Sequence, residues 1–312
     1  MGCVFLRVFE SGYVKCYLIS YTHLDVYKRQ ISVGNGLLAS AEYGNENRDH
    51  SPYAYIPDYD LREMLAHMSG VRSDEIYEEY GLIEKDVLRD LTRKYDDESG
   101  AYSLEGLQYL ENITEYASEG SEAVDYRPLE KLTKLKEFKD WHAPAYSIDF
   151  FQNMNQLEEI YLELGVGMDE GDTSLRPILD LTVLNPLTNL TSLTILEEAR
   201  YSQTIVLKNG MTQYQLVDPV ILSNHFGDTE VEYESNDEGF TCENGILSWN
   251  NLSSDTTELR YSWNARSDTD EGYFNFSGEA IVPLPVSYTH LDVYKRQELL
   301  FVTLHSNSEY KN

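Results

Sequence analysis

Histidines are the side chains most ready to act as acids, bases or metal ligands near neutral pH, and their spacing here argues against such a site. Four lie in the interpretable part of the sequence, and no two have metal-motif spacing: His50, His67, His142 and His225. The sequence also lacks a Gly-x-Ser-x-Gly nucleophile elbow, a phosphate-binding loop and a His-Glu-x-x-His helix. We therefore predict that the protein is not an enzyme, with no catalytic residue, no metal and no cofactor.

Two short acidic segments offer the oxygen ligands that calcium prefers. They contain Asp169, Glu170 and Asp172 in one case and Asp268, Asp270 and Glu271 in the other. Neither has the ligand spacing of a known calcium loop, and a solvated acidic loop is the favoured interpretation of both.

The charge of the chain limits its partners. Its 312 residues include 54 acidic and 24 basic residues, for a formal net charge of −30. Such a chain repels phosphate backbones and anionic membrane surfaces, so we expect no nucleic-acid partner. Apolar residues make up 41% of the chain, enough for a core. The interpretable region has no apolar run long enough to span a membrane.

An eleven-residue peptide occurs twice without change, at 20–30 and at 287–297. A structural repeat would diverge at its surface positions, whereas these copies are identical. The peptide back-translates to a nearly palindromic DNA sequence that resembles two transposase-adapter ends joined head to head and read through as coding sequence. A duplicated binding peptide is the alternative. We therefore treat residues 1–30 and 286–312 as a doubtful leader and tail and interpret about residues 31–285.

Residues 31–55 are interpreted as the end of a signal peptide and a polar linker, because Ala39-x-Ala41 has the small residues of a cleavage site. The interpretable region holds one cysteine, Cys242, which excludes an intramolecular disulfide and a cysteine metal cage. The cleavage motif predicts a secreted protein.

Three short helices are predicted between residues 56 and 92. Asp58 can cap the first, and Gly70 follows its last turn. Ser73 can cap the second, and a third carries one apolar stripe from Ile83 to Leu91. A helical unit of this size buries little surface alone, so we expect it to pack against the region that follows.

Apolar residues three apart dominate residues 93–207. This comb occurs at positions 104–116, 126–138 and 148–160, so that each copy begins at the same interval after the one before it. We place a fourth comb at 184–196, one period and a 14-residue insertion further on, with the insertion near 163–180. An α-helix, with about 3.6 residues per turn, would rotate such a stripe off the core. A fixed period of about 20–29 residues, here about 22 residues, is typical of a leucine-rich-repeat solenoid.

Two of the repeats, at 127–135 (RPLEKLTKL) and 185–193 (NPLTNLTSL), resemble the repeats of bacterial internalins. The opening of the helical unit at residues 56–62 resembles the internalin N-terminal cap. Residues 244–249 and 276–284 resemble the immunoglobulin-like domain that is fused to such repeats, and their alternation of apolar and polar residues independently indicates strands.

The resemblance covers about residues 56–284 and implies the architecture. We expect an α/β leucine-rich-repeat solenoid with a helical N-terminal cap at 56–92 and repeats at 93–207. An all-β immunoglobulin-like sandwich would follow at 208–285. The sequence departs from the family after each comb, where a buried asparagine ladder is usual. Those positions hold Ser121, Ala143, Gly165 and Tyr201.

In leucine-rich repeats, alternate residues of each short strand line a concave face. The register predicts that the following residues lie there: Glu119, Glu137, Lys139, Trp141, Glu159, Tyr161, Glu163 and Glu197. Exposed aromatic residues in an acidic field suit protein binding, and the field favours a basic or amine-bearing partner surface. An alternative for Trp141 is that it packs inward, in place of the leucine that is missing at Asp140.

The resemblance implies an extracellular or bacterial cell-surface location, and a non-catalytic module that binds a protein or glycan ligand through this concave face. Two alternatives stay open: a targeting appendage on a larger secreted enzyme, and a structural spacer without a partner of its own.

Overall fold

The computed structural model describes residues 3–10, 13–20, 51–71, 82–92, 94–97, 100–165, 175–207, 210–270 and 272–284, with backbone alone in the first two ranges. The chain divides into two units, Met1–Ser51 and Pro52–Asn312. In the first, strands β1 (Cys3–Glu10) and β2 (Tyr13–Ser20) form an antiparallel hairpin. The predicted cleavage site and the second copy of the duplicated peptide lie outside the described residues, as does nearly all of the first copy.

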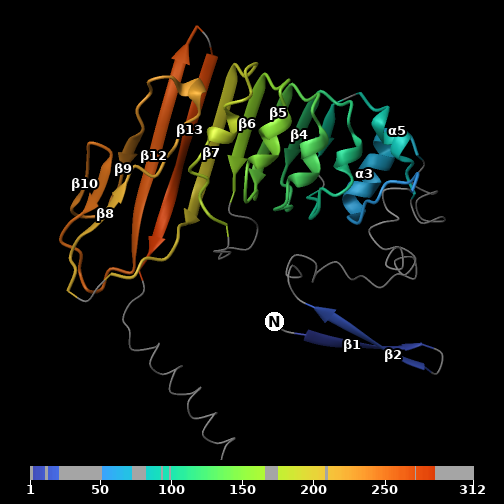
Figure 1. Ribbon diagram of the computed structural model, residues 1–312, viewed down its shortest axis with the longest axis horizontal. Helices are drawn as coiled ribbons and strands as arrows, with labels where there is room; N and C mark the ends of the chain where they lie inside the picture. Colours follow the sequence, from blue (N-terminus) through green and yellow to red (C-terminus); the bar gives the residue numbers. More distant parts are fainter. Residues whose placement is uncertain are drawn as a thin grey trace, which may run out of the picture. The chain divides into compact units, whose positions relative to one another are not determined.

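One eight-stranded sheet runs through the second unit (Figure 1). Its order is β3 (Tyr95–Asp97), β4 (Glu115–Glu119), β5 (Glu137–Ala143), β6 (Glu159–Leu164), β7 (Ser192–Tyr201), β13 (Gly272–Pro283), β12 (Glu258–Thr269) and β9 (Glu232–Glu234). Neighbouring strands are parallel from β3 to β13 and antiparallel from β13 to β9. The sheet therefore consists of one strand from each parallel coil of a solenoid, continued by the long hairpin of β12 and β13.

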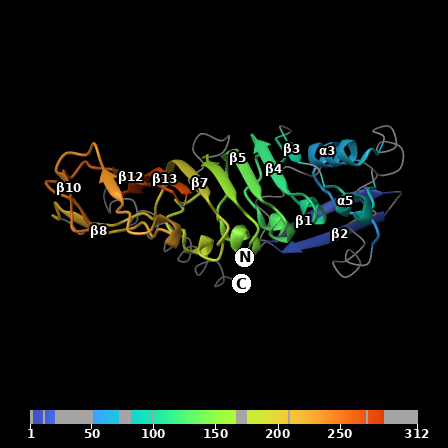
Figure 2. The same cartoon turned by 90° about the horizontal axis from the view of Figure 1, so that it is seen from above.

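Short 3-10 turns explain the three-residue comb. They are η2 (Leu107–Tyr109), η3 (Arg127–Lys131), η4 (Asp149–Asn153) and η5 (Thr182–Leu184), and Figure 2 shows such turns along one side of the strands. In the first comb, the N–H groups of Leu107, Leu110 and Ile113 each donate to the carbonyl three residues earlier, at 3.0, 2.9 and 3.2 Å. A turn of about three residues brings every third side chain to the same side, which here is the core.

The comb residues form the core, as predicted. Every member of the first three combs is buried. At the last position of the pattern, the rings of Tyr95, Tyr116 and Phe138 stack from one strand to the next, with centroids 5.0 and 4.8 Å apart. Tyr95 lies in β3, so the sheet has one more coil before the first predicted comb.

The fourth repeat begins three residues earlier than we predicted from the sequence. The N–H groups of Thr191 and Ser192 donate to the carbonyl of Glu158, as those of Glu158 and Glu159 donate to Lys136. Leu193 therefore pairs with Ile160, and the insertion is three residues shorter than predicted. The predicted register was wrong because six leucines, three apart from residue 181 to residue 196, match their own pattern after a shift of three.

Two of the three predicted helices are confirmed: α3 (Tyr59–Ser69) and α5 (Lys85–Arg89). Asp58 caps α3 by accepting the Leu61 N–H at 3.0 Å, and Gly70 ends it with a φ of 75°. The other Asp58 carboxylate oxygen accepts the Tyr102 N–H at 3.0 Å, which ties the helix to the first coil. The second predicted helix falls within residues 72–81, outside the described ranges.

A second, three-stranded sheet lies beside the hairpin, in the order β10 (Phe240–Glu243), β11 (Ile246–Trp249) and β8 (Tyr214–Val217). The short turn η6 (Asn224–Phe226) precedes β9. The rings of Trp249 and Tyr261, one from each sheet, lie 6.2 Å apart, and both are buried. Since β13 pairs directly with β7, the large sheet contains strands from both sides of residue 208, where the predicted immunoglobulin-like domain begins. The immunoglobulin-like identity of this region stays a prediction.

Candidate functional site: the open face of the sheet

We call the face of β4 to β7 that lies opposite the comb residues the open face. Burial alternates along β5 and β6, so every second side chain points to it. Strand pairing aligns these side chains in rows across the sheet. The rows are Glu115, Glu137, Glu159 and Ser192; then Ala117, Lys139, Tyr161 and Thr194; then Glu119 and Trp141, followed by Glu163 and Leu196.

Lys139 carries the one positive charge in these rows. Its ammonium lies 3.3 Å from the Glu137 carboxylate and 3.1 Å from that of Glu159 on the next strand. Partial burial lowers the pKa of Lys139, but its hydrogen bonds to Glu159 and Glu137 outweigh this and raise it overall. The face therefore binds one cation of its own between two glutamates and stays acidic.

Trp141 lies on the open face, partly exposed, with its ring centroid 5.7 Å from that of Tyr161. Inward packing of Trp141 is not observed. Asp140 is instead the buried neighbour, and its carboxylate accepts the Tyr126 hydroxyl at 2.8 Å. The Tyr161 hydroxyl donates to Glu163, and this bond, with partial burial, raises the pKa of Tyr161 to about 12.

A β-bulge follows Trp141. The pairing of β5 with β6 shifts between Asp140 and Ala143, and His142 is exposed with a φ of 64°. Gly165 passes so close that a Cβ there would lie 3.0 Å from the His142 carbonyl oxygen. Bulges of this kind redirect neighbouring side chains and are frequent near functional sites.

The structure does not bring the described histidines together. His67 is exposed on α3, and His142 is in the bulge. The ring of His225 is used structurally, since Nε2 lies 3.0 Å from the Leu187 carbonyl and Nδ1 lies 3.1 Å from the Ser223 hydroxyl. His50 lies outside the described residues.

Glu197 is not on the open face, so this part of the predicted site was wrong. It is 6% exposed and points inward because the fourth repeat starts three residues earlier. Its carboxylate lies 3.2 Å from the Arg200 guanidinium and accepts the Ile178 N–H at 3.1 Å. Burial raises the pKa of Glu197 to about 8, although Arg200 and the Ile178 N–H act in the opposite direction.

Arg200 replaces the missing asparagine ladder. Its buried guanidinium donates to the carbonyls of Ala145 at 2.9 Å, Gly165 at 2.7 Å and Ala143 at 3.4 Å. These carbonyls lie at or just after the ends of β5 and β6, so one side chain from β7 binds the ends of two earlier coils. We missed Arg200 in the sequence. The available signal was that Ala143 and Gly165, at the usual asparagine positions, have no side-chain donor, so buried carbonyls there need a donor from another residue.

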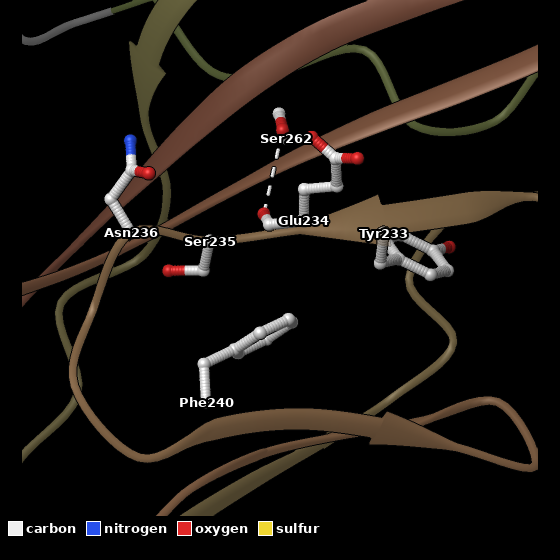
Figure 3. Close-up of a pocket in the computed structure, with 6 residues that line it drawn as sticks. All are labelled: Tyr233, Glu234, Ser235, Asn236, Phe240 and Ser262. Carbon is white, nitrogen blue, oxygen red and sulfur yellow. Dashed lines mark hydrogen bonds between the residues drawn. The ribbon is translucent and has the colours of Figure 1, made fainter.

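A groove of about 360 Å³ lies between β9 and β10 (Figure 3). It is lined by Tyr233, Glu234, Ser235, Asn236, Phe240 and Ser262. The Ser262 hydroxyl donates to the Glu234 carbonyl at 3.4 Å, and the Ser235 hydroxyl donates to the Arg260 carbonyl at 2.5 Å. Since both hydroxyls bond to the backbone and the lining holds no histidine, cysteine or lysine, we assign no reaction to this groove.

The acidic segments give no metal site within the described residues, where no group of three or more His, Cys, Asp or Glu side chains is placed to hold a metal ion. Asp268 lies 3.6 Å from the Arg266 guanidinium instead. Asp169, Glu170, Asp172 and Glu271 lie outside those residues. No helix in the described ranges is both long and apolar enough to cross a membrane.

The parallel coils and the open face resemble the architecture of a leucine-rich-repeat solenoid. No family model and no curated protein matches the sequence. An internalin (inlF) from Listeria monocytogenes is similar, with 20% identity, a TM-score of 0.34, and coverage of 46% of this chain and 44% of that one.

The functional domain of InlJ from Listeria monocytogenes matches with 16% identity and a TM-score of 0.35, covering 65% of this chain and 50% of that one. Internalin C2 from the same species matches with 20% identity and a TM-score of 0.35, covering 49% and 72%. The chain thus spans about half of the first two. The fold is established by the repeat and the strand register described above.

Proposed function

We propose that this chain is a non-catalytic protein-binding module, secreted or displayed on a bacterial surface, that binds its partner through the open face. The observation that carries the proposal is the composition of that face. Glutamates from β4, β5 and β6 surround a partly exposed Trp141 and Tyr161 on a parallel sheet. Exposed aromatic residues are enriched among side chains that dominate binding energies.

The electrostatics favour a partner with a basic surface. The five glutamates of the rows outnumber Lys139, and the chain as a whole carries a net charge of −30. Such a field accelerates encounter with a positive surface and disfavours a negative one. Binding should therefore weaken as salt concentration rises, because exposed charges are screened.

The test measures binding of the full chain to a panel of purified extracellular proteins with basic surfaces. The variant Glu137→Gln/Glu159→Gln removes two charges from the open face. The control Glu130→Gln/Asp149→Asn removes two exposed charges from the 3-10 turns on the other side. We expect the open-face variant to raise the dissociation constant about tenfold and the control to leave it within about twofold. Equal effects from both would contradict the proposed site.

A further inference from the structure

The part of the open face around Trp141 has a chemistry more specific than general acidity. Trp141 pairs with Glu119 on β4, and past the bulge Glu163 lies on the β6 side. Neighbouring strands are about 4.8 Å apart, so a planar group on the indole would have a carboxylate on either side within reach of its edges. Tyr161, whose ring lies 5.7 Å from Trp141, adds a second aromatic surface.

A neighbouring part of the open face already binds a cation between two carboxylates. There, the carboxylates of Glu137 and Glu159 flank Lys139 and bind its ammonium at 3.3 and 3.1 Å. Two residues further along β5, Trp141 lies between Glu119 of β4 and Glu163 of β6. Among the described residues, no ion pair joins Glu119 or Glu163 to a basic side chain. The Trp141 row thus combines two carboxylates, neither of them in an ion pair among the described residues, with an aromatic surface between them.

We infer that Trp141, Tyr161, Glu119 and Glu163 form a subsite for one arginine side chain of the protein partner. This rests on the proposed function and specifies the group that the open face recognises. Arginine fits better than lysine because its planar guanidinium is weakly hydrated and stacks on aromatic rings. Its fork of N–H groups also binds carboxylates at two edges. The Tyr161 hydroxyl donates to Glu163, which holds that carboxylate in place beside the indole.

The protein contains its own reporter for this subsite. Of its three tryptophans, Trp249 and Trp263 are buried and Trp141 is partly exposed. The experiment titrates the full chain with a capped Gly-Arg-Gly peptide while tryptophan fluorescence is recorded. The same titration is made with the lysine peptide and with the citrulline peptide, which has the shape of arginine without its charge. Trp141→Phe identifies the source of the signal.

We expect a saturable change with the arginine peptide, half complete at a concentration on the order of 1–10 mM. The Trp141→Phe variant should lose this change. Glu163→Gln and Glu119→Gln should each weaken binding about threefold or more, whereas the control Glu130→Gln, which removes one charge from the opposite side, should leave it unchanged. The citrulline peptide should give no saturable response.

Three results would overturn the inference: an equal response to citrulline, binding of the lysine peptide as tight as that of arginine, or an equal loss in Glu130→Gln. Failure here is distinguishable from failure of the proposed function. If a partner binds the open face but the arginine peptide does not, the subsite alone is wrong. If the peptide binds while open-face variants leave partner binding unchanged, the proposed function is wrong and the subsite stands.

Discussion

The two halves of the large sheet are built in different ways. From β4 to β7, each strand follows the 3-10 turns of its own coil, and the backbone bonds that set its register recur at the same place in successive coils. From β13 to β9, strands are positioned by hairpin and long-range pairing, with the Tyr273 N–H donating to the Thr191 carbonyl at 3.0 Å to join β13 to β7. Local repetition sets one half of the sheet, and tertiary contacts set the other.

The composition of the open face also changes along the sheet, between β6 and β7. Over β4 to β6 it holds glutamates around an aromatic pair. The positions of β7 and β13 that continue the same three rows hold uncharged residues: Ser192, Thr194, Leu196, Tyr273, Asn275 and Ser277. The strands β4 to β6 therefore provide the charged surface, and β7 and the hairpin extend the sheet. Substitutions in the hairpin should therefore affect stability first, and substitutions on the repeat face should affect binding first.

The largest effect is expected at the junction, from Arg200→Met. This change leaves the Glu197 carboxylate buried without its ion partner and leaves loop carbonyls of both earlier coils without a donor. Breaking one side of a buried pair costs about 3–5 kcal/mol of unfolding free energy. Urea denaturation of the full chain measures it. The double variant Glu197→Leu/Arg200→Met should be more stable than the single one, and the opposite order would contradict the role of the pair.

The same variant should show a pH dependence of defined sign. Burial raises the pKa of Glu197 in the folded state, and removal of Arg200 takes away a charge that opposes this. Between the unfolded and folded pKa values the folded state then binds more protons, so its stability falls as pH rises. We expect Arg200→Met to lose more stability at about pH 8 than at about pH 5, and denaturation at both values would check this. An equal loss at both would exclude titration of Glu197 as the cause.

The next effect lies in the hairpin half, at Gly278. A Cβ at this position would lie 2.5 Å from the Trp263 ring and 2.8 Å from the Glu197 Cβ. Gly278→Ala should therefore cost about 1–3 kcal/mol of unfolding free energy through overpacking. Ser277→Ala, one residue earlier and half-buried on the open face, is the matched control and should change stability by less than about 0.5 kcal/mol. Similar losses from both would argue against a close contact at Gly278.

The repeats were predictable from the sequence because their order is local. The backbone N–H groups of comb residues donate to the carbonyl of the comb residue three positions earlier. Periodicity alone therefore identifies the buried residues from Leu104 to Ile160. The same periodicity cannot distinguish a register from one shifted by three. Because of that ambiguity, the predicted register placed Glu197 on the wrong face and did not identify the role of Arg200. The orientation of both side chains depends on which leucine begins the fourth coil. The sequence also left open whether Trp141 or its neighbour Asp140 points inward. Asp140 is buried because its carboxylate accepts a hydrogen bond from the Tyr126 hydroxyl, and Tyr126 lies outside the strand, so the local pattern does not reveal this partner.

A smaller effect is expected at the start of the repeat half. Asp58→Ala removes the cap of α3 and also the acceptor of the Tyr102 N–H. Loss of a helix cap costs about 0.5–2 kcal/mol. Asp58→Asn should fall between the native protein and Asp58→Ala, because an amide has one carbonyl oxygen and can accept from Leu61 but not from Tyr102 as well. Thermal denaturation of the three proteins would measure the order, and equal stability of Asn and Asp would show that the bond to Tyr102 contributes nothing.

The smallest effect on stability is expected on the open face itself, from Lys139→Met. This variant leaves Glu137 and Glu159 facing each other without the ammonium between them. Partly exposed ion pairs contribute at most about 1 kcal/mol, and salt screens the remaining repulsion, so the loss should nearly vanish in about 1 M salt. Lys136→Met, which breaks one exposed pair with Glu158, is the matched control and should cost less still. Because Lys139→Met makes the face more acidic with little loss of stability, it should tighten binding of a basic partner, and weaker binding would place the partner's positive charge elsewhere.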